Sequence, residues 1–392
     1  MHDNPIGQAN NSFCKFPTSD DVENIIDLVL GEINNDDKRN LLEQEIYKLF
    51  ISQCKNIKEF IWQNSQPLSL FPGASTCFSL LHELRIEANF VSSDALHEMA
   101  QICKDLNTLI ISNPTLPELF SLIDAQRNLK ILKIYNSYNK KGSNKELGEA
   151  LIRKGNTLKC LHLRPVGTIP PSFLTSLINI TEISISSDGI HKDKEIHKYL
   201  SISEFPNLEI LKVDRLSCFE ELASLIEKTK GNISCVCITT VNKSAKNTDM
   251  LIKAIANNCP NIKYLYTYLI PQDFIHVKSL LLNCCFLEKL AFDSINFFAN
   301  KNDNIGDELL DILTKFSPKS LKDIAITEKW KFSTISLENF FKKRLLYSFD
   351  IIFDSCNHDQ HYFTANHEYM VMKYILEGVI SQSNCDYSFL YN

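Results

Sequence analysis

Several side chains near the C-terminus are of the types that bind zinc: Cys356, His358, Asp359, His361, His367 and Glu368. Thiolate, imidazole and carboxylate groups are the usual ligands of that metal. Their spacing matches no zinc motif, and the segment resembles a polar loop before a last helix, so we expect no metal here. A metal-binding or enzymatic role for this cluster remains an alternative that metal analysis of the purified protein would test.

A second candidate for chemistry is the pair Cys235 and Cys237, which flank Val236. On a strand these thiols lie on one face, where residues two apart are poorly placed for a disulfide. We interpret them as surface thiols, or as positions that tolerate small residues. The sequence also lacks the phosphate-loop, serine-hydrolase, HExxH and CxxC motifs. We therefore expect a protein that is not an enzyme and uses no cofactor.

The elements that would position any site follow from a repeat. An apolar residue, two variable residues and two more apolar residues spaced by one recur about every 25 residues, from Ile57 to Ile326. The last two anchors of each unit alternate with other residues, as in a strand with one buried face. The period and signature predict an α/β leucine-rich-repeat solenoid, a horseshoe of about eleven strand-helix units.

Between the predicted strands lie segments with helical periodicity. In Ser93–Cys103, for example, a Ser-Asp start precedes an apolar stripe at Leu96, Met99 and Ala100. We predict helices at 41–54, 93–103, 117–127, 144–154, 192–203, 218–229, 246–258, 271–283, 305–316 and 335–345. Parallel strands would then line the concave side and helices the convex side. Cys54, Cys103, Cys259 and Cys284 each stand three residues before a first anchor, where a small buried residue would end a helix.

The repeats divide the chain into three parts. Residues 1–40 form a polar segment, which we expect to be partly disordered, with a single helix at 21–33. The solenoid spans 41–346. Residues 347–392 form a C-terminal cap with a helix near 367–379, since the end of a solenoid must cover its core.

Charge and hydropathy exclude several classes of protein. A net charge of −6 argues against general nucleic-acid binding, which needs a cationic excess. No apolar run is long enough to span a membrane, and the N-terminus does not resemble a secretion signal. We expect a cytoplasmic or nuclear protein whose thirteen cysteines are reduced.

Alternation along the strands identifies candidate partner-binding residues on the concave face. One group is a basic stripe and the other an aromatic ladder, and the set is Arg85, Lys133, Tyr135, His162, Arg164, Lys212, Tyr264, Tyr266 and Tyr268. A slip of one residue would place the tyrosines in the core, and nearby glutamates could neutralise the stripe. We predict that Tyr266→Ala weakens partner binding without unfolding the protein, whereas a large loss of thermal stability would show that the ring belongs to the core.

Repeat units such as 101–111 and 258–265 resemble those of F-box/leucine-rich-repeat proteins, particularly the fungal F-box-like set. The similarity covers roughly residues 41–380. In that family an N-terminal F-box docks on the adaptor of a cullin-RING ubiquitin ligase, while the repeats hold the substrate. This resemblance implies a substrate-recognition component of an SCF-type ligase, although no F-box is recognisable before Ile57.

We therefore predict an interaction module that binds a protein partner, of unknown identity, on its concave face. A cullin-RING adaptor is a second expected partner if an F-box is encoded upstream. A free-standing repeat scaffold, or a decoy that binds targets without delivering them, is the alternative.

Overall fold

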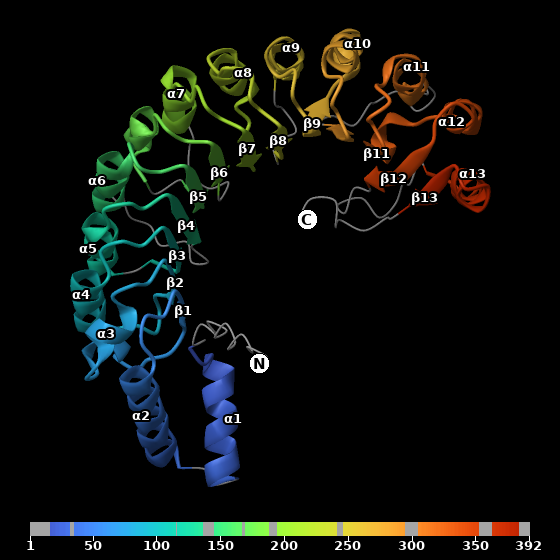
Figure 1. The fold of residues 1–392 in the computed structure, drawn as a ribbon. Coiled ribbons are helices and arrows are strands. Elements are labelled where there is room, and N and C mark those ends of the chain that lie inside the picture. Colours follow the sequence, from blue (N-terminus) through green and yellow to red (C-terminus); the bar gives the residue numbers. More distant parts are fainter. Residues whose placement is uncertain are drawn as a thin grey trace, which may run out of the picture. The chain divides into compact units, whose positions relative to one another are not determined.

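The structure is a computed structural model that describes residues 16–31, 35–114, 116–135, 145–166, 169–187, 194–240, 246–294, 305–352 and 363–383. The chain forms two compact units, Met1–His162 and Leu163–Asn392. Figure 1 labels their helices and strands.

The first unit contains parallel strands that follow chain order. These are β1 (Glu59–Trp62), β2 (Glu83–Glu87), β3 (Thr108–Ser112), β4 (Ile131–Tyr135) and β5 (Cys160–Arg164), the last of which ends beyond the unit boundary. Equivalent anchors pair across the strands, since Leu84 is in register with Phe60 on β1 and with Leu109 on β3. These three side chains are buried. The predicted alternation therefore sets the register of the sheet.

Helices cover one face of these strands (Figure 1). They are α3 (Ala74–Phe78), α4 (Ser93–Ile102), α5 (Glu118–Ala125) and α6 (Lys145–Lys154), with a 3-10 turn at Leu68–Leu70. We call the other face of each unit's strands its open face.

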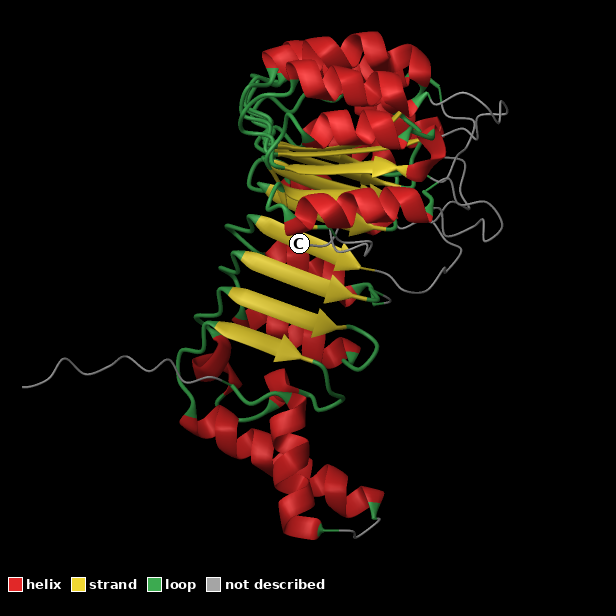
Figure 2. Cartoon of the chain, turned by 90° about the vertical axis from the view of Figure 1, so that its right-hand side faces the viewer, coloured by secondary structure: helices red, strands yellow, loops and turns green. Residues whose placement is uncertain are grey.

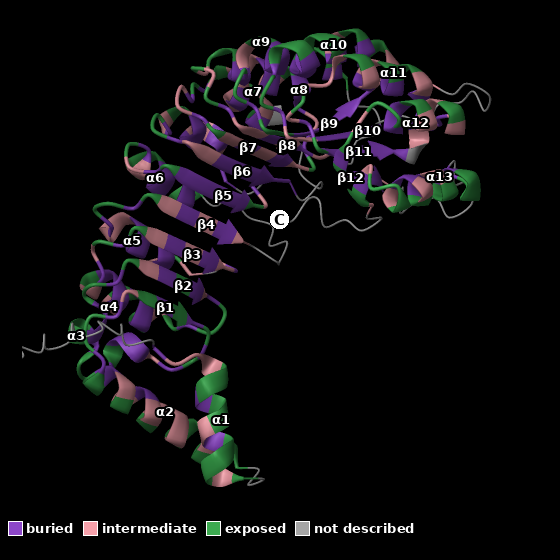
Figure 3. Cartoon of the chain, turned by 45° about the vertical axis from the view of Figure 1, so that its right-hand side comes forward, coloured by how far each residue is buried: buried purple, intermediate pink, exposed green. Residues whose placement is uncertain are grey.

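Two further helices precede β1, namely α1 (Ser19–Leu30) and α2 (Asp36–Gln53). The helix predicted at 21–33 corresponds to α1, while the one predicted from residue 41 begins earlier, at Asp36. Asn35 explains this start, because its side chain accepts a hydrogen bond from the Lys38 backbone N–H. The helices pack against each other, and much of their outer surface is exposed (Figure 3).

An aromatic cluster joins the segment before α1 to the sheet of the first unit. The Phe16 ring lies 5.0 Å from that of Phe60 on β1, 5.9 Å from Phe78 on α3 and 6.1 Å from Tyr47 on α2. Phe16 is only 6% exposed although it lies in the polar N-terminal segment.

The second unit repeats the same alternation. Its strands are β6 (Glu182–Ser186), β7 (Ile210–Asp214), β8 (Cys235–Ile238), β9 (Tyr264–Leu269), β10 (Lys289–Ser294), β11 (Asp323–Thr327), β12 (Leu346–Ile352) and β13 (Ile380–Gln382). Its helices are α7 (Lys194–Ile202), α8 (Phe219–Glu227), α9 (Thr248–Asn258), α10 (Phe274–Asn283), α11 (Gly306–Phe316), α12 (Thr334–Phe341) and α13 (Ala365–Leu376), with 3-10 turns at Pro171–Ser176, Pro271–Asp273 and Glu328–Trp330. Within the unit the strands are parallel and in chain order. Figure 2 draws them as yellow arrows.

The strands β12 and β13 extend the sheet into the region that the sequence assigns to a cap. Phe349 on β12 is in register with Ile324 on β11, and Ile380 on β13 is in register with Leu346. The helix predicted near 367–379 is α13, which lies between these strands in the chain. The repeat thus continues past residue 346.

The four repeat cysteines end helices as predicted. Each is the C-cap of α2, α4, α9 or α10, and its backbone N–H bonds to the carbonyl four residues earlier. All four are buried, and burial raises the pKa of Cys103 and of Cys284 to about 12. All four cysteines are therefore core residues, and the thiols of Cys103 and Cys284 stay protonated at neutral pH.

Along the described residues, no helix combines the length and hydrophobicity needed to cross a membrane.

Candidate interaction surface

The basic candidates of the first unit lie on its open face but do not touch one another. Register places Ile110 of β3 between Arg85 of β2 and Lys133 of β4, so these cations are two strands apart, or about 10 Å. Arg85 donates from Nε to Oε1 of Glu83 at 2.7 Å. Tyr135 lies two residues beyond Lys133, in register with Ser112. The stripe is therefore a set of separated side chains, one of which is partly neutralised.

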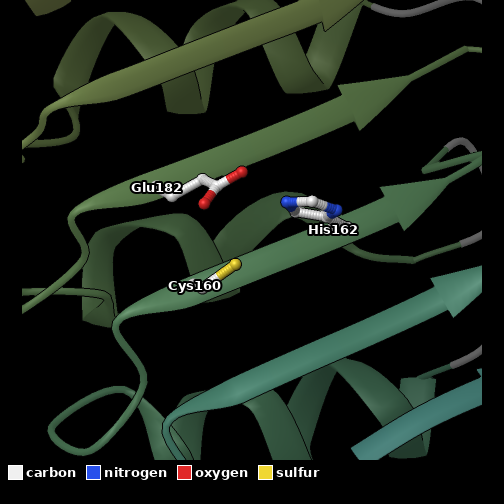
Figure 4. A group of neighbouring side chains, drawn as sticks. All are labelled: Cys160, His162 and Glu182. Carbon is white, nitrogen blue, oxygen red and sulfur yellow. The ribbon is translucent and has the colours of Figure 1, made fainter. Parts of the chain in front are cut away.

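Two side chains of β5 lie close enough to bind one metal ion together. Cys160 and His162 project from the same face of the strand (Figure 4), with a sulfur and a ring nitrogen within 4.8 Å of each other. Both are buried. The third side chain drawn there, Glu182, lies on β6 of the second unit. Two protein ligands are fewer than a structural zinc site uses.

In the second unit, one row of the open face runs across β6 to β9. Ser184, Lys212, Cys237 and Tyr266 are successive register partners. Arg164, the other basic candidate of this unit, donates from its guanidinium to Oγ of Ser184 at 3.2 Å. The structure thus brings Arg164 to one end of the row that contains Lys212 and Tyr266.

The three tyrosines of β9 lie on the open face, because Leu265 and Thr267 between them are 2% and 0% exposed on the helix side. Their accessibility differs greatly: Tyr264 is 41% exposed, Tyr266 7% and Tyr268 8%. The rings of Tyr266 and Tyr268 pack edge to face at 6.2 Å, and Tyr268 donates from its hydroxyl to the Thr240 carbonyl at 3.1 Å. Burial raises the pKa of Tyr268 to about 12, and it raises that of Tyr266 well above the ordinary value. Only Tyr264 offers its ring to a partner.

This burial changes the expected result for Tyr266. We predict that Tyr266→Ala lowers the free energy of unfolding by about 2 kcal/mol, because a packed ring is removed. Tyr266→Phe should cost less than half as much, because it keeps the ring contacts. Urea denaturation of the full chain measures both changes, and an unchanged midpoint for Tyr266→Ala would contradict the packing described here.

A group of carboxylates beside the tyrosines was missed at the sequence level. Asp293, Asp323 and Asp350 lie on β10, β11 and β12, around Ala291 and Ala325. Each carboxylate is about nine-tenths buried. The same alternation would have identified them, because Asp323 precedes one strand anchor and Asp293 follows another.

The carboxylates are linked to cations and hydroxyls on the same face. Lys289 of β10 lies 5.8 Å over the Tyr264 ring, and its Nζ is 3.3 Å from Oδ2 of Asp323. Lys329 lies 3.9 Å from Asp293, and Ser348 donates from Oγ to Asp350 at 2.6 Å. We call Tyr264, Tyr266, Tyr268, Lys289, Asp293, Asp323 and Asp350 the β9–β12 surface. It combines one exposed aromatic ring, a type of side chain enriched in protein interfaces, with buried and paired Asp and Lys side chains, which are types depleted there.

The thiols of Cys235 and Cys237 are partly exposed on the open face of β8. Burial raises the pKa of Cys237 to about 12 and also raises that of Cys235. A thiol at such a pKa is neither a good nucleophile nor a good metal ligand at neutral pH. These side chains therefore act as small surface groups between Lys212 and the tyrosines.

The zinc-type cluster is only partly described. Cys356, His358, Asp359 and His361 lie outside the described residues. Both ring nitrogens of His367 are engaged, because Nδ1 contacts the Thr364 hydroxyl at 2.8 Å and Nε2 contacts the Phe332 carbonyl at 2.7 Å. His367 therefore caps α13 and supports the core in place of offering a ligand atom.

No family model matches this sequence, and no curated protein matches it. Solved structures do match its fold. A chain from the crystal structure of the yeast Rad7–Elc1 complex superposes with a TM-score of 0.50 and 12% identity, over 86% of this chain and 89% of that one. Both units have the leucine-rich-repeat fold. A leucine-rich-repeat-containing protein from Legionella pneumophila, LegL7, also matches, with a TM-score of 0.33 and 12% identity over 84% of this chain and 93% of that one.

Proposed function

We propose that this protein is a non-enzymatic substrate receptor that binds a protein partner on the β9–β12 surface and Lys212. The observation that carries the proposal is the accessible Tyr264 ring, held beside Lys289 among buried, partnered side chains. Interface hot spots are aromatic or cationic side chains whose surroundings exclude water. Arg85, Lys133 and Tyr135 on the open face of the first unit are proposed as a separate set of partner contacts, whereas the side chain of His162 is buried.

A link to a ubiquitin ligase is the second part of the proposal. Two observations support it: the resemblance of the repeats to F-box/leucine-rich-repeat proteins, and the fold shared with a chain crystallised in the Rad7–Elc1 complex. The hairpin of α1 and α2 offers a surface for a ligase adaptor, because it presents Leu28, Val29 and Leu41, which are 86%, 63% and 60% exposed. Leu28 and Val29 lie on α1 and Leu41 lies on α2, and exposed apolar side chains that form a patch are typical of a docking site.

The experiment is affinity purification of the tagged chain from its own cells with the proteasome inhibited, followed by mass spectrometry. We expect both a substrate protein and a cullin-RING adaptor. The double variant Leu28→Asp and Val29→Asp should lose at least nine-tenths of the adaptor and keep the substrate. A matched control is Ile275→Asp on α10, at a side chain that is 73% exposed.

Recovery of partners without any adaptor would contradict the ligase link and leave a free-standing scaffold or decoy. Loss of the adaptor in the Ile275→Asp variant as well would contradict the role of the hairpin. We further propose a cytoplasmic or nuclear location and no requirement for a cofactor, which fits a receptor of this kind.

A further inference from the structure

A pocket of about 660 Å³ lies outside the open face, where α12 and α13 end and β12 and β13 begin. It is lined by Phe341, Lys342, Lys343, Arg344, Leu345, Lys373, Tyr374, Glu377 and Val379. Cations are the main charged groups of this lining, although the whole chain has a net charge of −6. The proposed receptor function does not use this pocket.

Arg344 is a fixed cation in the pocket wall. Its Nη2 donates to the carbonyls of Leu313, Thr314 and Ser317 at 3.0, 3.2 and 2.9 Å, which fixes the guanidinium against the end of α11. Its Nε is buried without a hydrogen-bond partner, and burial lowers the pKa of the guanidinium. Among the described residues Arg344 pairs with no carboxylate. A desolvated cation without a counter-charge favours an anion nearby.

The lysines of the pocket differ in whether a carboxylate neutralises their charge. Lys342 and Lys373 share one carboxylate, since their Nζ atoms lie 3.1 and 3.5 Å from Oε1 of Glu338. Lys343 is exposed and forms no ion pair within the described ranges. The C-terminal ends of α12 and α13 each contribute about half a negative charge. When these helix ends, Glu338 and Glu377 are set against the three lysines and Arg344, roughly half to one positive charge stays without a negative partner.

This balance suits a singly charged group better than a doubly charged one. A phosphate would need several cations that are not yet engaged, whereas Lys343 alone meets that condition. The remaining walls are apolar, from Phe341, Leu345 and Tyr374. Leu345 and the nearby Leu376 are 76% and 85% exposed, so the apolar surface continues outside the pocket. A carboxylate beside an apolar side chain matches both features.

We propose that this pocket is a second docking site, which binds an acidic peptide segment of a partner protein by one Asp or Glu carboxylate and an adjacent apolar side chain. Lys343 contacts the carboxylate, and Leu345 packs against the apolar side chain. The surface is separate from the β9–β12 surface, so a partner bound there leaves the open face accessible.

Fluorescence polarisation of the full chain with labelled degenerate peptide pools tests this site. The pools carry a central Leu-Glu, Leu-Gln or Leu-phosphoserine. We expect the Leu-Glu pool to bind at least tenfold more tightly than the Leu-Gln pool. Lys343→Glu should remove that difference, while the control Lys253→Glu, an exposed lysine of α9, should change binding less than twofold.

Equal binding of the Leu-Glu and Leu-Gln pools, or no binding of either, would overturn the proposal. So would an unchanged affinity of the Lys343→Glu variant. Tighter binding of the phosphoserine pool than of the Leu-Glu pool would overturn the assignment of a singly charged ligand.

Discussion

Phe16→Ala is expected to lower the free energy of local unfolding of the helical hairpin, α1 and α2, by about 3 kcal/mol. The ring is 6% exposed and contacts aromatic residues of α2, α3 and β1. Alanine would leave a cavity among rings that have no other side chain to fill it. Because one residue joins three elements, its loss should open the hairpin locally while the second unit stays folded.

Hydrogen exchange of the full chain, resolved by peptide, measures this effect directly. A loss of about 3 kcal/mol corresponds to roughly 100-fold faster exchange of amides that open with the hairpin. Amides of β9 to β11 should not change. The control Phe16→Leu keeps most of the apolar volume and should cost about 1 kcal/mol. Unchanged exchange of α2 and β1 in Phe16→Ala would show that the aromatic cluster does not hold the hairpin.

Tyr264→Ala is expected to weaken partner binding by about 2 kcal/mol, or roughly 30-fold. The ring is exposed, so a partner can cover it. It lies under the Lys289 ammonium, and this contact positions the ring and Lys289 before a partner binds. The stability of the protein should change by less than about 0.5 kcal/mol, because the side chain is not part of the core. Titration against the partner recovered by affinity purification gives the dissociation constant.

Tyr347→Ala is the matched control. Tyr347 on β12 is 54% exposed, but strand alternation places it on the face opposite the open face. It should leave partner binding unchanged. Similar losses for the two variants would show that any exposed tyrosine gives the effect. No loss for Tyr264→Ala would exclude this ring as a binding hot spot.

The repeat made most of the fold predictable. Anchors such as Leu84, Leu109 and Leu290 are fully buried, and most of the observed helices lie within a few residues of the predicted ones. This success follows from geometry. The second and third anchors of each unit are two residues apart, as in a strand with one buried face, and the first anchor lies three residues earlier, where the chain enters the strand. The extra strand β12 was predictable too, since Leu346, Phe349 and Ile351 repeat the signature.

The accessibility of the candidate site was not predictable from the same pattern. Alternation assigns Tyr264, Tyr266 and Tyr268 to one face of a strand. It does not give the packing between neighbouring side chains on that face, which covers Tyr266 and Tyr268 and leaves Tyr264 exposed. The cation pocket was likewise hidden, because Arg344 and Lys373 come together only when α12 and α13 pack side by side.

Site-specific photocrosslinking in the protein's own cells tests most directly whether the open face of the second unit binds a protein partner. A photoreactive phenylalanine analogue would replace Tyr264 in one variant and Tyr347 in another. We expect a covalent adduct to a distinct protein from position 264, which excess wild-type chain abolishes, and none from position 347. The absence of an adduct at position 264, or the same adduct from both positions, would contradict this expectation.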